Sequence, residues 1–191
     1  MTAELTARTE LGSADDQLAL RARDGDTRAF DTLVRRYESR LLRFALRMLN
    51  DATDAEDVLQ WTFVRAYRGL RAYRPGGYFS SWIYRIALNE CRRRMKTRGR
   101  QQQCTTDLDA ELPAASKQEP QSVVIAGDRN RMIREAVYAL PAHYREVIVL
   151  FYFDDLSVEE LAQAMGISVS AAKVRLHRGR ARLGAALEGR L

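Results

Sequence analysis

Apolar residues recur at helical spacing along most of the chain. Between residues 27 and 49 they fall at steps of three and four, which places them on one face of a helix. These positions are Phe30, Val34, Tyr37, Leu41, Phe44 and Met48. Asp26 stands just before them, where an N-cap belongs. No alternating apolar and polar run of useful length occurs in the sequence, so the pattern predicts an all-α fold.

Further helices follow at the same spacing. One is predicted to begin at Thr53, with Glu56 three residues later as a capping box, and to end before Pro75 and the two glycines that follow it. Its apolar positions are Val58, Leu59, Phe63, Tyr67 and Leu70. The remaining predicted helices cover about residues 80–97, 123–140, 142–153, 158–165 and 169–187.

Residues 97–122 interrupt this pattern. They contain three consecutive glutamines, Pro113 and Pro120, and few large apolar side chains. Such a composition is typical of a flexible linker. The sequence therefore predicts two small helical domains joined by a linker. The predicted boundaries are a flexible N-terminal tail at 1–14, a first domain at 15–97, the linker at 98–122 and a second domain at 123–191.

The charge composition favours a polyanionic partner. Lys and Arg together number 31 against 25 Asp and Glu, a formal net charge of +6. Only Lys96, Lys117 and Lys173 are lysines, and arginine is the cation best suited to phosphate oxygens and guanine edges. The N-terminus lacks the features of a secretory signal, and the longest apolar run, residues 147–153, is far shorter than the roughly 20 residues that span a bilayer. We therefore expect a cytoplasmic protein that binds nucleic acid.

Nothing in the sequence points to catalysis. His143 and His177 are the only histidines, and neither has an acid and a nucleophile placed around it. Cys91 and Cys104 match no zinc spacing, and no phosphate-binding glycine loop is present. We expect no metal, no cofactor and no enzymatic activity.

Residues 156–183 have the pattern of a helix-turn-helix. Ser157 and Glu160 form a predicted capping box, Gly166 supplies the turn, and Ser168 is a candidate second N-cap. The helix after Ser168 carries five cations and one histidine, with no acidic residue until Glu188. A capped helix pair whose second helix is positively charged is typical of major-groove DNA binding.

A second basic helix follows a group of aromatic residues. Seven cations against Glu90 alone lie between Arg85 and Arg100, and the preceding aromatics are Tyr73, Tyr78, Phe79, Trp82 and Tyr84. Cations beside aromatic rings suit single-stranded nucleic acid, because phosphates pair with arginine and unstacked bases stack on rings. Some of these rings are equally expected to pack in the core.

An acidic segment precedes these aromatics. Asp51, Asp54, Glu56 and Asp57 lie at a helix start, followed by Gln60. Acidic residues at a helix N-terminus are stabilised by the helix dipole, so simple capping explains part of this cluster. The number of acidic residues also suggests a docking site for a protein, and the sequence leaves both interpretations, capping and docking, open.

Three stretches of this sequence resemble, in order, the conserved regions of extracytoplasmic-function (ECF) sigma factors of bacterial RNA polymerase. They are DAEDVLQWTFVRAY at residues 54–67, FSSWIYRIALN at residues 79–89, and residues 140–183. The resemblance covers about residues 26–187. It implies an initiation subunit of the polymerase that carries the two domains retained in this group.

The resemblance assigns roles to particular residues. It implies that the acidic helix docks on the β′ subunit of core RNA polymerase through Asp54, Glu56, Asp57, Gln60 and Phe63. It implies that the −10 element, with one base flipped out of the stack, is bound by Tyr78, Phe79, Trp82, Arg85, Asn89, Arg92, Arg93 and Lys96. It implies that the −35 element is read by Ser168, Ser170, Lys173, Arg175, His177, Arg178 and Arg182. The family often has Gly-Thr-Val where this chain has Ser170, Ala171 and Ala172.

The family also implies partners. These are the β′ and β subunits of core RNA polymerase, promoter DNA, and an inhibitory anti-sigma factor that is often membrane-anchored. The competing hypothesis is a stand-alone helix-turn-helix regulator. It explains the C-terminal motif, but not the acidic helix or the second basic, aromatic-rich helix.

Overall fold

The computed structural model describes residues 14–74, 78–105 and 126–188, and all regular elements in these ranges are helices. This confirms the all-α prediction. After a helix over residues 14–23, the elements are α2 (Thr27–Leu49), α3 (Ala52–Gly69), the 3-10 helix η1 (Leu70–Ala72), α4 (Phe79–Thr105), α5 (Ala126–Ala139), α6 (Ala142–Tyr152), α7 (Val158–Met165) and α8 (Val169–Glu188). The predicted tail up to residue 13 and the linker residues 106–122 lie outside the described residues.

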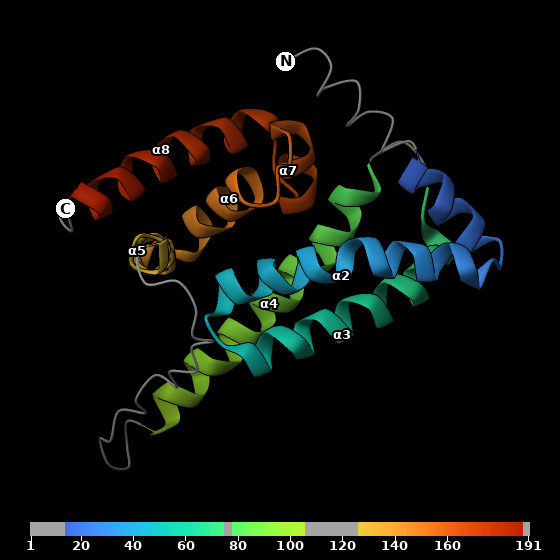
Figure 1. The fold of residues 1–191 in the computed structure, drawn as a ribbon, viewed down its shortest axis with the longest axis horizontal. Coiled ribbons are helices and arrows are strands. Elements are labelled where there is room, and N and C mark those ends of the chain that lie inside the picture. Colours follow the sequence, from blue (N-terminus) through green and yellow to red (C-terminus); the bar gives the residue numbers. More distant parts are fainter. Residues whose placement is uncertain (1–13, 75–77, 106–125, 189–191) are drawn as a thin grey trace.

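The first domain is built from α2, α3 and α4, which pack against one another (Figure 1). The apolar face of α2 lies largely as the sequence predicts, because Tyr37, Leu41, Phe44 and Met48 are buried. Phe30 and Val34 are half-buried at the end of that face. In α3 the prediction was wrong for Tyr67, which is 53% exposed and packs its ring edge-on against Phe30.

The start of α3 differs from the predicted capping box. The helix begins at Ala52, and the side chain of Asp51 accepts a hydrogen bond from the backbone N–H of Asp54 at 2.8 Å. Thr53 therefore lies inside the first turn. Both aspartate and threonine favour the N-cap position, but a carboxylate there also interacts with the helix dipole and, in this fold, with Arg98.

The helix α4 is longer than predicted, because it continues to Thr105 instead of ending near residue 97. Arg98 forms ion pairs with Asp51 at 2.8 Å and with Asp54 at 2.5 Å. These contacts hold α4 beyond its apolar inner face. The residues after Arg98 include no proline before Pro113, so nothing local forces the helix to stop earlier.

Two aspartates of the first described helix tie the domain together. The buried Asp15 accepts a hydrogen bond from the Tyr37 hydroxyl at 2.7 Å and pairs with Arg36. Asp16 accepts hydrogen bonds from the Tyr73 hydroxyl at 2.5 Å and from the backbone N–H of Phe79 at 2.8 Å. Asp16 thus fixes Tyr73 and the first residue of α4, which lie on opposite sides of the segment at 75–77.

The second domain consists of α5 to α8. In the helix α6 the four consecutive residues Val147, Ile148, Val149 and Leu150 are fully inaccessible. Gly179 lets α8 approach α6 closely, because a Cβ atom there would lie 3.2 Å from Cγ1 of Ile148. The inner face of α8 is completed by Ala172 and Leu176.

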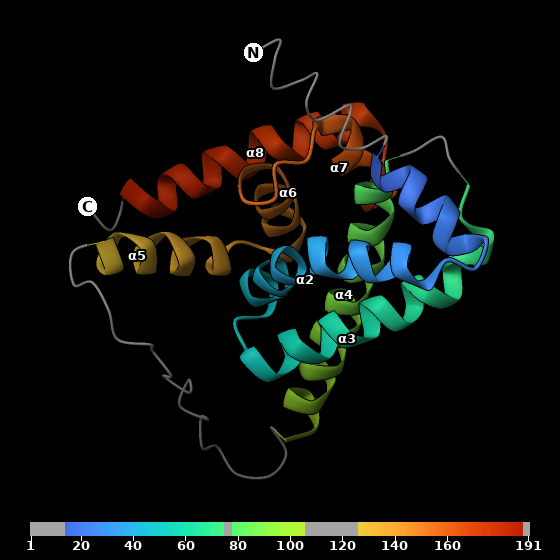
Figure 2. The same ribbon diagram turned by 45° about the vertical axis from the view of Figure 1, so that its right-hand side comes forward.

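The two domains pack directly against each other (Figure 2). The helix α7 lies on α4, and α5 and α6 lie on α2. Polar contacts cross this boundary at several points. In two of them, a side chain of α4 donates to a buried carboxylate of the second domain. The Tyr84 hydroxyl donates to Oδ1 of Asp154 at 2.7 Å, and Arg92 donates to both carboxylate oxygens of Glu146 at 2.8 and 2.7 Å.

Candidate nucleic-acid interface

The helix-turn-helix formed by α7 and α8 has the caps that the sequence predicts. The Ser157 side chain accepts from the backbone N–H of Glu160, and the Glu160 side chain accepts from the backbone N–H of Ser157 at 2.9 Å. Gly166 ends α7 in the left-handed region, at φ 68°, which glycine adopts without strain. The Ser168 hydroxyl accepts from the backbone N–H of Ala171 at 3.2 Å. The turn and the start of α8 are therefore fixed by local chemistry.

The outer face of α8 presents the predicted −35 residues to solvent. Arg175 is half-buried, and the others are exposed: Ser168, Ser170, Lys173, His177, Arg178 and Arg182. Among the described residues, no ion pair engages Lys173, Arg175 or Arg178. Arg182 stacks at 5.1 Å over the Tyr144 ring, and Arg180 at 5.3 Å over both Phe151 and Tyr152. This face therefore carries positive charge with no internal carboxylate to neutralise it.

The predicted −10 residues divide into a buried and an exposed set. Phe79 is 1% exposed and packs against Tyr37, Tyr73 and Trp82, so it belongs to the core and has no surface for DNA in this conformation. Trp82 is half-buried. The exposed set consists of Tyr78, just before α4, and of Arg85, Asn89, Arg93 and Lys96 along one side of that helix.

Two of the predicted −10 arginines form ion pairs with carboxylates of the same chain. Arg92 binds Glu146 of the second domain, as described above, and Arg93 donates to Oε2 of Glu90 at 3.0 and 2.7 Å. Glu90 also pairs with Arg65 of α3 at 2.6 Å. By contrast, Arg85 and Lys96 form no ion pair within the part of the chain that is described.

A groove of about 640 Å³ lies between α3 and α4. Its walls include Trp61 and Trp82, and Asn89 faces it together with Arg65 and Arg68. Aromatic walls, an amide and cations are the groups that hold an unstacked base and its phosphates. The sequence identified Asn89 and Trp82 but missed Trp61, Arg65 and Arg68. These three residues stand four and three positions apart and therefore share one face of α3. That face indicates a site only once α4 is known to lie beside it.

The predicted polymerase-docking residues are only partly available. Asp54 and Asp57 pair with Arg94 at 2.8 and 2.6 Å, and Asp54 also binds Arg98. Glu56 and Gln60 are exposed, whereas Phe63 is half-buried and packs edge-on against Phe30. The surface of α3 that remains combines Glu56 and Gln60 with three exposed apolar side chains. These are Trp61, Val64 and Tyr67.

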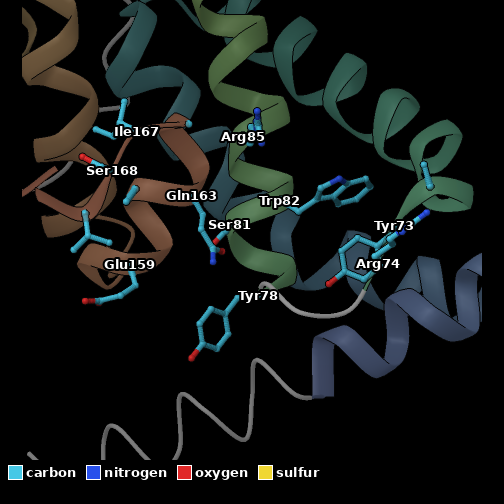
Figure 3. Close-up of a pocket in the computed structure, with 14 residues that line it drawn as sticks. Tyr73, Arg74, Tyr78, Ser81, Trp82, Arg85, Glu159, Gln163, Ile167 and Ser168 are labelled. Atoms are coloured by element: carbon cyan, nitrogen blue, oxygen red, sulfur yellow. The ribbon is translucent and has the colours of Figure 1, made fainter. Parts of the chain in front are cut away.

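A cavity of about 640 Å³ lies beside the contact between the start of α4 and the helix-turn-helix (Figure 3). Tyr78, Trp82 and Arg85 line it from the first domain, and Gln163 and Ser168 line it from the second. Nearby, the Ser80 hydroxyl donates to Oε1 of Glu160 at 2.6 Å, so the capping box of α7 also contacts α4. The N-terminal ends of the two predicted DNA-reading helices therefore face the same small space.

Asp154 lies at the centre of the contact between the domains. Burial raises the pKa of its carboxyl to about 6, although the Tyr84 hydrogen bond and the charges of Arg40, Arg47 and Arg43 act in the opposite direction. Arg40 donates to its backbone carbonyl at 2.8 Å rather than to its carboxylate. The Oδ2 atom is buried without a hydrogen-bond partner.

Two further observations concern chemistry other than nucleic-acid binding. Burial raises the pKa of the Cys91 thiol well above its usual value, so it remains protonated and unreactive. Within the described ranges, no three metal-ligating side chains cluster and no helix is both long and apolar enough to cross a bilayer.

Comparison with known proteins identifies two family regions. The model for "Sigma-70 region 2" matches residues 33–101, and the model for "Sigma-70, region 4" matches residues 130–183. The RNA polymerase sigma-H factor of Pseudomonas aeruginosa is 32% identical over 91% of this chain and 94% of its own length. The ECF RNA polymerase sigma factor SigW of Bacillus subtilis is 34% identical, covering 82% of this chain and 87% of that protein.

Two solved structures are similar over most of the chain. CnrH in complex with the cytosolic domain of CnrY shows 31% identity and a TM-score of 0.69, covering 92% of this chain and 98% of that one. The sigma factor RpoE in complex with the anti-sigma factor NepR, from Bartonella quintana, shows 26% identity and a TM-score of 0.67. That match covers 83% of this chain and 96% of that one.

Proposed function

This chain belongs to the ECF group of the sigma-70 family, and from that premise we propose how its residues share the work of promoter recognition. As a sigma factor it binds core RNA polymerase, directs it to promoters through the −35 and −10 elements, and is held inactive by an anti-sigma factor. The observation that carries the proposal is the presence, in one chain, of a capped helix-turn-helix with an unneutralised basic face and an aromatic, cationic groove on the other domain.

The second domain, proposed to span residues 123–191, would read the −35 element in duplex form. The outer face of α8 is the only part of the helix-turn-helix that combines exposure with positive charge among the described residues. Lys173, Arg175 and Arg178 are placed to contact phosphates or base edges, with Ser168 and Ser170 at the N-terminal end of the helix.

The first domain, proposed to span residues 15–97, would open and hold the −10 element. We assign the flipped base to the groove between α3 and α4, where Asn89 offers a donor and an acceptor between two tryptophans. Arg68 lines this groove, and Arg85 and Lys96 are exposed on α4. These three cations suit the phosphates of the displaced strand. Phe79 acts from within the core by holding Trp82 in place.

The polymerase-binding surface is proposed to be the exposed side of α3. Glu56 and Gln60 supply polar contacts, and the exposed apolar side chains of Val64 and Tyr67 supply buried area. The ion pairs of Asp54 and Asp57 with Arg94 have a second consequence. They fix α3 against α4, so the polymerase-binding and DNA-binding surfaces are held in one rigid unit.

The packed arrangement of the two domains is proposed to be the inactive one. The names of the two promoter elements place them about 25 base pairs apart, which is roughly 85 Å of duplex at 3.4 Å per base pair. In this structure the N-terminal ends of α4 and α8 instead line one cavity of about 640 Å³. The helices α4 and α8 therefore cannot contact both elements of one promoter until the domains separate.

Two negative expectations belong to the same proposal. We propose that the chain has no catalytic activity of its own, because strand synthesis belongs to the polymerase. We also propose that it works in the cytoplasm, where the polymerase and the chromosomal promoters are found.

The direct test is run-off transcription by bacterial core RNA polymerase, with and without the protein, on a pool of promoter fragments from the host genome. We expect discrete transcripts only when the protein is added. Lys173→Ala combined with Arg178→Ala should reduce these transcripts, whereas Arg28→Ala, an exposed arginine at the far end of α2, should leave them unchanged. Absence of transcripts, together with binding to intact duplex without polymerase, would favour a stand-alone regulator.

A further inference from the structure

The cavity beside the start of α4 and the helix-turn-helix has a lining of mixed chemistry (Figure 3). Its volume of about 640 Å³ lies within the range of roughly 300–1,000 Å³ that is typical of small-molecule sites. Tyr78, Ser81 and Arg85 line it from the first domain, and Gln163 and Ser168 line it from the second. An aromatic ring, hydroxyls, a cation and an amide therefore meet in one space, which we call the interdomain cavity.

The positive charge at the interdomain cavity is not neutralised by ion pairs. Arg74 and Arg85 line it, and neither pairs with a carboxylate within the described ranges. The Arg85 guanidinium lies close to the turn of the helix-turn-helix, because a Cβ atom built on Gly166 would lie 3.7 Å from one of its nitrogens. Among the described residues of the lining, Glu159 alone carries a carboxylate, and its side chain points away from Tyr78 (Figure 3). This space therefore suits an anion.

The first turn of α8 lies at the same end of the interdomain cavity. Ser168 and Val169 line it. The Ser168 hydroxyl accepts from the backbone N–H of Ala171, whereas the N–H groups of Val169 and Ser170 have no acceptor within the helix. Backbone N–H groups at the start of a 20-residue helix bind phosphate readily.

A buried hydroxyl gives an independent sign of a missing ligand. Ser81, in the first turn of α4, lines the interdomain cavity and is 2% exposed. Its Oγ atom is buried and has no hydrogen-bond partner in the part of the chain that the structure describes. A buried polar group without a partner costs free energy, which a bound acceptor would recover.

Tyr78 supplies an open ring for stacking. It is 37% exposed and makes no ring contact with the described residues, whereas Trp82 already packs against Tyr73 and Phe79. An aromatic face of this kind stacks on a nucleobase. The exposed Gln163 extends from α7 towards Tyr78 (Figure 3), and its amide offers both a donor and an acceptor to the edge of a base.

We propose that the interdomain cavity binds a free nucleotide. Its phosphates would lie between Arg85 and the first turn of α8, and its base would stack on Tyr78 beside Gln163. The Ser81 hydroxyl would donate to an oxygen of the nucleotide. A nucleotide of the promoter strand has the same chemistry, but the walls of the cavity come from both domains. The site therefore exists only in the packed arrangement, in which α4 and α8 cannot contact one promoter together.

A nucleotide in the interdomain cavity would compete with promoter DNA, a consequence that rests on the proposed function. Arg85 is assigned to the −10 strand and Ser168 to the −35 duplex, and both would face the nucleotide instead. Initiation would then fall as the nucleotide concentration rises through its dissociation constant, and this response would need no protein partner.

The test titrates the full-length protein with ADP and GDP in a calorimeter, without polymerase. We expect a dissociation constant of about 0.1 mM or tighter for at least one of them. Adenosine and inorganic pyrophosphate should each bind about tenfold or more weakly, because each keeps only part of the contacts. Absence of binding by both nucleotides would overturn the proposal, and so would pyrophosphate that binds as tightly as the nucleotides.

Three variants assign the binding to the interdomain cavity. Arg85→Ala should weaken it by about tenfold or more, since a charge-assisted contact to phosphate is lost. Ser81→Ala should weaken it by about threefold while leaving the thermal midpoint unchanged, because the hydroxyl has no partner among the described residues. The matched control, Lys96→Ala, lies exposed on the same helix outside the lining and should change it less than about twofold. Equal losses in Arg85→Ala and Lys96→Ala would contradict the proposal.

A photoreactive nucleotide locates the site and separates the two sources of nucleotide. Cross-links of 8-azido-ADP to Tyr78 or to residues 163–169 would support the proposal. Cross-links to residues 61–69 would place the nucleotide in the groove between α3 and α4 instead and overturn it. A single-stranded oligonucleotide that displaces ADP at equal nucleotide concentration would assign the cavity to the promoter strand.

The outcome is independent of the proposed function, because binding is measured without polymerase. Transcripts in the run-off assay together with no nucleotide binding would overturn this inference and leave the proposed function intact. Nucleotide binding together with no transcripts would do the reverse.

Discussion

Asp154 is a carboxylic acid buried at the contact between the two domains. Its pKa of about 6 exceeds the ordinary value of 3.8, so the packed arrangement binds a proton that a solvated Asp154 would release. Between these two values, packing takes up close to one proton. The packed arrangement is therefore favoured at low pH and weakened as the pH rises towards 6, with little further change above it.

We expect the ratio of packed to separated molecules to fall roughly tenfold between about pH 5 and pH 7. Energy transfer between dyes on the two domains of the isolated protein measures this ratio. Asp154→Asn keeps the hydrogen bond from Tyr84 but cannot ionise, and it should make the ratio nearly independent of pH in this range. An unchanged pH dependence in Asp154→Asn would show that another group controls it.

Asn89 is the residue whose role is most specific to strand opening. Its side chain is exposed in the groove between the two tryptophans and makes no hydrogen bond to the described residues. Asn89→Ala should therefore leave the fold unchanged while weakening −10 discrimination by about 1–3 kcal/mol, the value of one good base contact. Permanganate reactivity of the opened promoter and a core-polymerase binding assay measure the two effects separately. Loss of polymerase binding in this variant would mean that Asn89 is structural.

The identity of individual site residues was only partly predictable from the sequence. Arg85 and the α8 cations could be chosen because their neighbours mark helices whose outer faces must be polar, whereas Asn89 was assigned through the resemblance to ECF sigma factors. The engagement of Arg92 by Glu146 could not be predicted, because the two residues are 54 positions apart and meet only through the packing of the domains. For the same reason, Asp16 gave no local sign that it holds Tyr73 and the start of α4.

The elements of the helix-turn-helix were predictable because their boundaries depend on neighbours in sequence. Ser157, Glu160, Gly166 and Ser168 satisfy backbone groups within four residues of themselves. The ends of α3 and α4 were less predictable. Asp51 competes with Thr53 as a cap, and α4 is extended by ion pairs from Arg98 to another helix.

The capping box of α7 supports a prediction about stability. Ser157→Ala removes the acceptor for the backbone N–H of Glu160 and should lower the free energy of unfolding by about 0.5–2 kcal/mol. Ser170→Ala serves as the control, since Ser170 is an exposed serine within α8 and caps nothing. Thermal unfolding of the two variants compares them directly. Equal midpoints would show that the Ser157 hydroxyl contributes nothing to the turn.

At the scale of the whole molecule, the two-domain all-α architecture followed from the sequence, but the contact between the domains did not. The residues that make it, such as Tyr84 and Asp154, look like ordinary core and loop residues in their own segments. Their partners become evident only in three dimensions. This contact also matters for function, because it brings the starts of α4 and α8 to one cavity.

The most direct test of the account is the distance between the two domains with and without core RNA polymerase. Spin labels at Arg43→Cys on α2 and Asn130→Cys on α5, two positions that line one groove between the domains, report this distance by double electron–electron resonance in a Cys104→Ser background. Both labelled positions are exposed, whereas Cys91 is buried and should not react. The isolated protein should give a single short distance. Binding to core polymerase should lengthen it by several tens of ångströms, as expected for elements roughly 85 Å apart along duplex DNA. A polymerase complex that starts transcription while the short distance persists would contradict the account.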